Sequence, residues 1–334
     1  MDMMAVLCEL TAAFGPSGAE TGAAGVIERI ARQYCDETSR DTLGNLICRK
    51  KGSGPKVMFA AHMDSIGLVV THIDEKGFAR VGAIGGVHPA DVLHTPVRFR
   101  NGACGKVSAD RDIEPGKLKT ADLFIDLGAE SREEAERLVR VGDVAVYGTQ
   151  TVQAGSRIIS PYMDNRVSCL VLLMAMEKLH QTANDLYFVF PGQEEVGLRG
   201  GKTAAWGVDP DCGIAVDVTV ADDEPGSKHL NSSVLGGGAA VKIMDSSVIC
   251  DPKIVELLMD LAKAGNIAAQ RDVIRSGGTD AGAIHQTRCG VRAGGISVPC
   301  RYVHTPTEMV DQNDISACAA LVAAFAEAKL EKEC

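Results

Sequence analysis

Acids and histidines follow the apolar runs of this sequence at positions where they could hold metal ions and activate water. His62 and Asp64 come directly after one apolar run, and Glu194 and Glu195 come after another. A carboxylate two residues beyond a histidine can fix the tautomer of a metal-bound imidazole. Two adjacent acids after a buried strand are costly unless a positive group compensates them. A metal ion would do so, with one acid binding it and the other serving as a general base.

Three further residues could complete a metal centre. Asp164 lies at the start of a long expected helix, where the helix dipole favours a carboxylate that could bridge two cations. Asp217 ends an apolar run, and His304 precedes a proline that stiffens its loop. One bridging carboxylate, with a further carboxylate and a histidine for each ion, suits a pair of zinc- or cobalt-like ions. The candidate ligands are therefore His62, Asp164, Glu195, Asp217 and His304.

Each cluster also has an ordinary structural interpretation. The His62 segment could be a polar turn, Asp164 a plain N-cap, and the glutamate pair a solvated turn. His94 stands in the same His-Thr-Pro tripeptide as His304. It falls inside an expected insertion, away from the acids, so we interpret it as structural. All five candidates fall at strand ends or element junctions of one α/β domain, where open sheets bind ligands, and this conjunction favours a site.

The periodicity of apolar residues predicts the elements that position these groups. Residues 1–14 and 18–34 have helical spacing, with Ser17 expected to cap the second helix. Residues 68–156 show short alternating β segments and one helix, with Ser131 and Glu134 in a capping-box pattern. Beyond residue 158 we expect helices at 164–180, 200–206, 252–264 and 311–331, and strands at 186–190, 212–218 and 291–297. The catalytic domain is thus predicted to be discontinuous, 1–67 and 157–334, with a β-rich insert at 68–156.

Composition narrows the class of protein. The chain has 334 residues, 46% of them hydrophobic, with 36 glycines, which is typical of a large α/β enzyme with many tight turns. A formal net charge of −10 disfavours nucleic acid as a partner. Eleven cysteines without a CxxC pair indicate reduced thiols rather than a disulfide framework. The sequence contains neither a basic signal-peptide start nor an 18-residue apolar run, which predicts a cytoplasmic protein without a membrane partner.

The whole chain resembles the M42 aminopeptidases, relatives of the M18, M20 and M28 co-catalytic zinc peptidases. The resemblance rests on FGPSGAE, DTLGNLI, AAHMDSIGLVV, LFIDLGAESREEAERLVRVGD, MDNR, GQEEVGLRGG, DVT, SGGTDAGAIH and HTPTEM, in that order. It implies a three-layer α/β/α zinc-peptidase domain with a mixed sheet, interrupted by a small barrel-like or PDZ-like insert used in assembly. It also implies a homo-oligomer, in many members a tetrahedral dodecamer built from dimers.

The resemblance also implies a role for each site residue. His62 and Asp217 would complete the shell of one metal, Glu195 and His304 that of the other, with Asp164 bridging. The catalytic pair would be Glu194, the general base, and Asp64, the carboxylate behind His62. Zinc is the first expectation for both ions, with cobalt or manganese as alternatives, because nitrogen and oxygen ligands suit all three.

The function that follows is hydrolysis of N-terminal residues from short peptides by a water that two metals activate, with Glu194 as the base. Two alternatives stay open: a two-metal deacylase or deacetylase of amino-acid derivatives, and a non-catalytic assembly or metal-storage protein. The presence of Glu194 argues against a metal-storage protein, because a storage site has no need for a second acid that does not bind the metal. Some members of the family have been labelled cellulases, but glycosidases use two carboxylates without paired metals.

Overall fold

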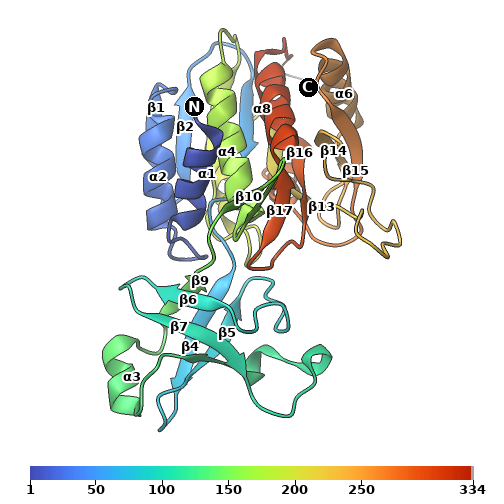
Figure 1. Cartoon of the computed structure of the whole chain (residues 1–334). Coiled ribbons are helices and arrows are strands. Elements are labelled where there is room, and N and C mark those ends of the chain that lie inside the picture. Colours follow the sequence, from blue (N-terminus) through green and yellow to red (C-terminus); the bar gives the residue numbers. More distant parts are fainter. Residues whose placement is uncertain (332–334) are drawn as a thin grey trace.

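A large mixed sheet forms the centre of the molecule in the computed structural model, which describes residues 1–331 (Figure 1). Four of its strands are parallel neighbours, in the order β12, β3, β13, β16. Antiparallel strands extend the sheet on both sides, and β14 and β15 branch from β16. The strands are β1 (Glu37–Arg40), β2 (Leu46–Lys50), β3 (Lys56–Ala60), β10 (Val152–Ala154), β11 (Arg157–Ser160), β12 (Asp185–Phe190), β13 (Cys212–Val220), β14 (Ala239–Met244), β15 (Ala269–Val273), β16 (Arg292–Arg301) and β17 (Glu308–Asp311).

Helices cover both faces of this sheet. One face is covered by α1 (Met3–Ala12), α2 (Thr21–Ala31), α4 (Met163–Lys178), α6 (Pro252–Ala264) and α8 (Gln312–Glu327). The other face is covered by α5 (Arg199–Val208) and α7 (Asp280–His285). Strand β3 shows why the central strands are largely apolar: alternate residues face opposite sides, and both sides are buried. The expected three-layer α/β/α arrangement is confirmed.

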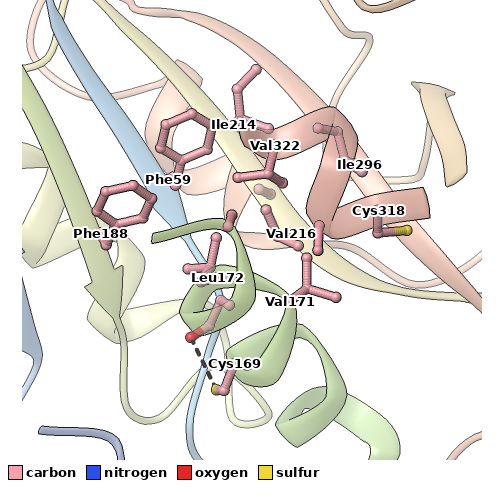
Figure 2. Packing of buried hydrophobic residues seen from close by; sticks show 14 of the residues in the cluster. Phe59, Cys169, Val171, Leu172, Phe188, Ile214, Val216, Ile296, Cys318 and Val322 are labelled. Carbon is pink, nitrogen blue, oxygen red and sulfur yellow. Dashed lines mark hydrogen bonds between the residues drawn. The ribbon is translucent and has the colours of Figure 1, made fainter. Parts of the chain in front are cut away.

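The main core lies between the sheet and helices α4 and α8 (Figure 2). Phe59 of β3 stacks on Phe188 of β12, with ring centroids 5.3 Å apart. Val171 and Leu172 project from α4 toward the same layer, where Val322 of α8 also packs. These buried contacts fix α4 against the sheet, and Asp164 stands in the first turn of that helix.

A closed six-stranded antiparallel barrel is inserted between β3 and β10 (Figure 1). Its strands are β4 (Gly67–Ile73), β5 (Ala79–Ile84), β6 (Pro96–Phe99), β7 (Cys104–Ala109), β8 (Leu123–Asp126) and β9 (Val144–Tyr147). Two 3-10 turns (Pro115–Lys117 and Thr120–Asp122) and helix α3 (Arg132–Leu138) complete it. The ring of Tyr162, just before α4, stacks on Tyr147 of the barrel at 5.5 Å, which ties the two parts together.

The barrel strands occupy Gly67–Tyr147, whereas β10 pairs with β11 in the large sheet. The limits 68–156 for the insert therefore remain an interpretation. Because β4 pairs with β9, the six strands close into a barrel, as the barrel-like insert expected from the sequence requires.

Several details differ from the predicted elements. Ser17 does not cap α2, whose N-cap is Glu20, because the Ser17 hydroxyl donates instead to Asp64 at 2.6 Å. The capping box of α3 is half formed: Ser131 accepts from the Glu134 amide, but the Glu134 carboxylate accepts from the amide of Glu130. The last helix ends at Glu327 rather than at residue 331. Strands β14, β15 and β17 were not predicted at all.

Candidate metal centre

The parallel strands deliver the candidate ligands to one edge of the sheet. Residue Ala60 of β3 is level with Ala215 of β13 and Val189 of β12. Two residues further along, this register places Asp217 level with His62. Asp217 lies within β13 rather than at its end, because Val218–Val220 stay paired with β16 after β3 has ended. His304 follows β16, so four neighbouring strands each contribute to the same edge, as the rule for open sheets predicts.

Two groups of possible ligand atoms meet there, and Asp164 belongs to both. His62, Asp164 and Asp217 form one group, and Asp164, Glu195 and His304 form the other, each with its ligand atoms within 4.8 Å of one another. Nε2 of His62 lies 3.1 Å from Asp164 Oδ1, and Nε2 of His304 lies 3.2 Å from Asp164 Oδ2. Each oxygen of one carboxylate thus faces a different imidazole, as a bridging ligand requires.

Glu194 lies beside these groups without belonging to either. Its carboxylate is 3.7 Å from His62 Nε2, and the side chain is almost fully buried. Burial raises the pKa of Glu194 well above its usual value, with Asp217 adding to the shift and His62 opposing it. The position of this carboxylate beside the two groups, and outside both, leaves it available as a proton acceptor.

The donor set fits two divalent cations. Burial, together with the charge of Asp164, raises the pKa of both Glu195 and Asp217. A cluster of buried, mutually repelling carboxylates is stable only when protons or cations neutralise it. Within residues 1–331, Glu195 Oε1 is buried and accepts no hydrogen bond. Its other oxygen, Oε2, lies 3.1 Å from His304 Nε2. A buried, unsatisfied carboxylate oxygen in such a place is a suitable metal ligand.

Asp64 organises the site more widely than its sequence position suggested. His62 Nδ1 lies 3.3 Å from the carbonyl oxygen of Asp64 and 3.5 Å from the Asp64 carboxylate, which leaves Nε2 for a metal. The same carboxylate accepts hydrogen bonds from the backbone amides of Glu194 at 3.0 Å and Glu195 at 3.3 Å. Ser17 donates a further bond at 2.6 Å. One buried carboxylate therefore orients the imidazole and the loop that carries both glutamates.

Glu308 likewise orients the backbone of two candidate ligands, and it was not predicted from the sequence. Its carboxylate accepts from the amide of Asp164 at 3.0 Å and from the amide of His304 at 2.7 Å. Glu308 is buried at the start of β17. The only indication in the sequence was its place in HTPTEM, four residues after His304.

The barrel also contributes to the site. Nδ1 of His304 lies 3.1 Å from the carbonyl oxygen of Gly86, so the ring donates there and presents Nε2 to Asp164 and Glu195. A Cβ at Gly86 would lie 2.6 Å from that nitrogen, so only glycine allows this approach. His94, the other histidine in a His-Thr-Pro tripeptide, is exposed on the barrel and does not line the cleft.

Two more buried ionisable groups near the site were not predicted. Arg166 is fully buried on α4 and donates to the carbonyls of Leu10, Ala13 and Gly15, which fixes the segment that carries Ser17. Asp280 begins α7 and is fully buried, and burial raises its pKa to about 7. Cys169 packs behind His62, where its thiol donates to the His62 carbonyl oxygen at 3.2 Å, and burial raises its pKa, which disfavours the reactive thiolate.

The metal candidates line part of a cleft of about 560 Å³. The other walls come from the end of β13, the loop between β15 and α7, and the residues around His304. No helix among residues 1–331 has the length and apolarity needed to cross a membrane.

Fold and cleft together define a class, the peptidases built on an α/β domain with an inserted barrel. An aminopeptidase from the archaeon Desulfurococcus kamchatkensis shares this structure, with a TM-score of 0.94 at 38% identity over 99% of this chain and 96% of that one. The TET1 peptidase of Pyrococcus horikoshii, described as assembling into a tetrahedron or a large octahedral shell, has a TM-score of 0.88 at 30% identity over 97% of this chain and 99% of its own.

The chain belongs to the M42 family. The family model described as M42 glutamyl aminopeptidase matches residues 44–321. A lysyl aminopeptidase from Pyrococcus furiosus is 36% identical over 327 residues, which cover 94% of this chain and 93% of that protein. These relatives support a peptidase hydrolase, and the resemblance seen in the sequence is confirmed.

Proposed function

We propose that this protein is a two-metal aminopeptidase that removes N-terminal residues from short peptides. The observation that carries the proposal is the shared carboxylate of Asp164, which faces both imidazoles. His62 and Asp217 would hold one ion, and Glu195 and His304 the other. The ions, zinc first and cobalt or manganese as alternatives, would lower the pKa of water and polarise the scissile carbonyl.

The chain's own residues supply the remaining steps. Glu194 takes the proton from the attacking water, since its buried carboxylate has a raised pKa and is not needed as a ligand. Asp64 and Glu308 hold the backbone of the base and of three ligands, so little reorganisation is needed during the reaction. The free α-amine of the peptide binds at the acidic cluster of the cleft.

A panel of chromogenic substrates tests the proposal. Free aminoacyl-p-nitroanilides should be hydrolysed by protein reloaded with zinc or cobalt, and not by chelated protein. Matched substrates with an acetylated α-amine should react at least about tenfold more slowly, because an acylated nitrogen loses the positive charge that the acidic cleft binds. Release of acetate from the acetylated series, measured by chromatography because it leaves the anilide bond intact, would favour the deacylase alternative. No turnover in either series would favour a storage or assembly role.

We further propose a closed homo-oligomer, in the first instance a dodecamer, on the basis of similarity to structures of the TET1 peptidase, one of which is described as a dodecamer. Closed symmetry reuses the same contact surfaces in every subunit. Light scattering at micromolar concentration should give a mass of about twelve chains, and a monomer would contradict the proposal. Deleting the barrel is not a clean test, because Gly86 orients His304. We also place the protein in the cytoplasm, which fractionation of the source cells would test.

A further inference from the structure

We infer that the cleft selects peptides whose first residue has a neutral, apolar side chain of the size of leucine or methionine. The inference rests on the proposed aminopeptidase function and assigns its substrate class. It departs from both the glutamyl description of the family model and the lysyl activity of the relative from Pyrococcus furiosus.

Charge in the cleft is confined to the cluster of metal candidates and Glu194. The ionisable lining residues are the five candidate ligands and Glu194. Within residues 1–331, every other residue that lines the cleft is neutral. Once two cations and the α-amine of a peptide neutralise this acidic cluster, the rest of the cleft offers no charge to pair with a substrate side chain. An acidic or basic side chain placed there would be desolvated without compensation.

The basic residues closest to these walls are already paired or lie outside the cleft. Lys242 lies behind β13, where its Nζ forms an ion pair with Asp272, and it is 1% exposed. Arg301, two residues before Val303 in the wall, pairs with Asp223 at 2.6 Å. Arg275 is exposed and does not line the cleft. Arg199, which follows Leu198 of the wall, is exposed, donates to Gln193 at 3.2 Å and does not line the cleft. Among residues 1–331, no lysine or arginine therefore lines the cleft where it could bind a substrate glutamate.

The threonine hydroxyls of the wall are likewise engaged within the protein. Thr219 donates to Asp272 at 3.1 Å and accepts from Lys242 at 3.3 Å. Thr279 donates to Asp245 at 3.0 Å. Both hydroxyls thus bond to buried groups behind the wall, which reduces their capacity to bind a polar side chain of the substrate.

Apolar side chains make up much of the remaining surface. Val218 and Val220 come from the end of β13, Ile274 from the loop that precedes α7, and Leu198 and Val303 from the loops beside the glutamates and His304. Burying a leucine or methionine side chain against such a wall is favourable in proportion to the apolar area removed from water. The cleft of about 560 Å³ has room for such a side chain.

The test compares kcat/KM for leucyl-, methionyl-, glutamyl- and lysyl-p-nitroanilide on the zinc-loaded full chain. Leucyl and methionyl substrates should exceed both charged substrates by roughly 10- to 100-fold. A preference for the glutamyl or lysyl substrate would overturn the inference while leaving the aminopeptidase proposal standing. If none of the four substrates is hydrolysed, both the inference and the aminopeptidase proposal are wrong.

Variants at Ser276 test whether this wall of the cleft determines the preference for the first side chain of the substrate. Ser276 is exposed and lines the cleft, so a charge introduced there should not prevent folding. Ser276→Arg should raise glutamyl relative to leucyl hydrolysis by about five- to tenfold, and Ser276→Asp should do the same for the lysyl substrate. The control, Ser39→Arg on exposed β1, adds the same charge outside the cleft and should leave the ratios unchanged. Unchanged ratios in both Ser276 variants would contradict the assignment of these walls to the substrate side chain.

Discussion

Replacing Glu194 by glutamine is expected to lower kcat by about two to four powers of ten while both metal ions stay bound. The amide has nearly the same size as the carboxylate but cannot accept the proton of the attacking water. Glu194 belongs to neither group of possible ligand atoms, so metal content should not change. The loop should also keep its position, because Asp64 holds it through the backbone amide of residue 194 rather than through the side chain.

The measurement pairs steady-state kinetics with metal analysis of the same purified sample. Glu133→Gln on exposed α3 removes the same charge far from the cleft and should behave as the parent protein. A Glu194→Gln protein with parental kcat would end the assignment of this residue as the base. Loss of one metal equivalent would instead indicate that Glu194 is a ligand.

Replacing Asp164 by asparagine is expected to remove both metals and, with them, essentially all activity. Its two oxygens lie 3.1 Å from His62 Nε2 and 3.2 Å from His304 Nε2, so it is the residue common to both groups. A neutral amide is a much weaker ligand than a carboxylate, and losing a shared anion weakens two shells at once. Metal analysis after dialysis should find well below one equivalent per chain.

Glu195→Gln is the matched control for this second prediction. Glu195 belongs to only one of the two groups, so its loss should release one ion and leave the other. If Asp164→Asn retains one full equivalent and Glu195→Gln retains two, the bridging role belongs to another residue. Circular dichroism of both variants distinguishes a metal effect from loss of the fold.

Much of the site could be predicted from the sequence, because each main group follows an apolar strand that had to be buried. The run before His62 and the run before Glu194 became β3 and β12, which are parallel and in register. In parallel strands the carboxyl ends meet at one edge, so local patterning was enough to bring distant residues together. Helix α4, expected from residue 164, begins at Met163, although Asp164 and Asn165 depart from helical φ and ψ, and most of its residues are buried.

The weaker elements could not be predicted in this way. Strand β14 begins within a glycine-rich stretch, and β17 has only four residues. Each is held mainly by neighbours such as β16 that are distant in sequence. A short strand of this kind forms because an unpaired neighbouring strand is there to pair with it. That neighbour is distant along the chain, so the local sequence does not reveal it.

The sequence by itself determined the fold class, the family, and the residue types that meet at the cleft. Only the tertiary structure decided how those residues are held: Asp64 binds the amides of Glu194 and Glu195, and Glu308 binds those of Asp164 and His304. It also decided that a carbonyl from the barrel orients His304. The physical reason is that hydrogen bonds act over about 3 Å in space whatever the separation along the chain, whereas apolar periodicity reports only the local backbone.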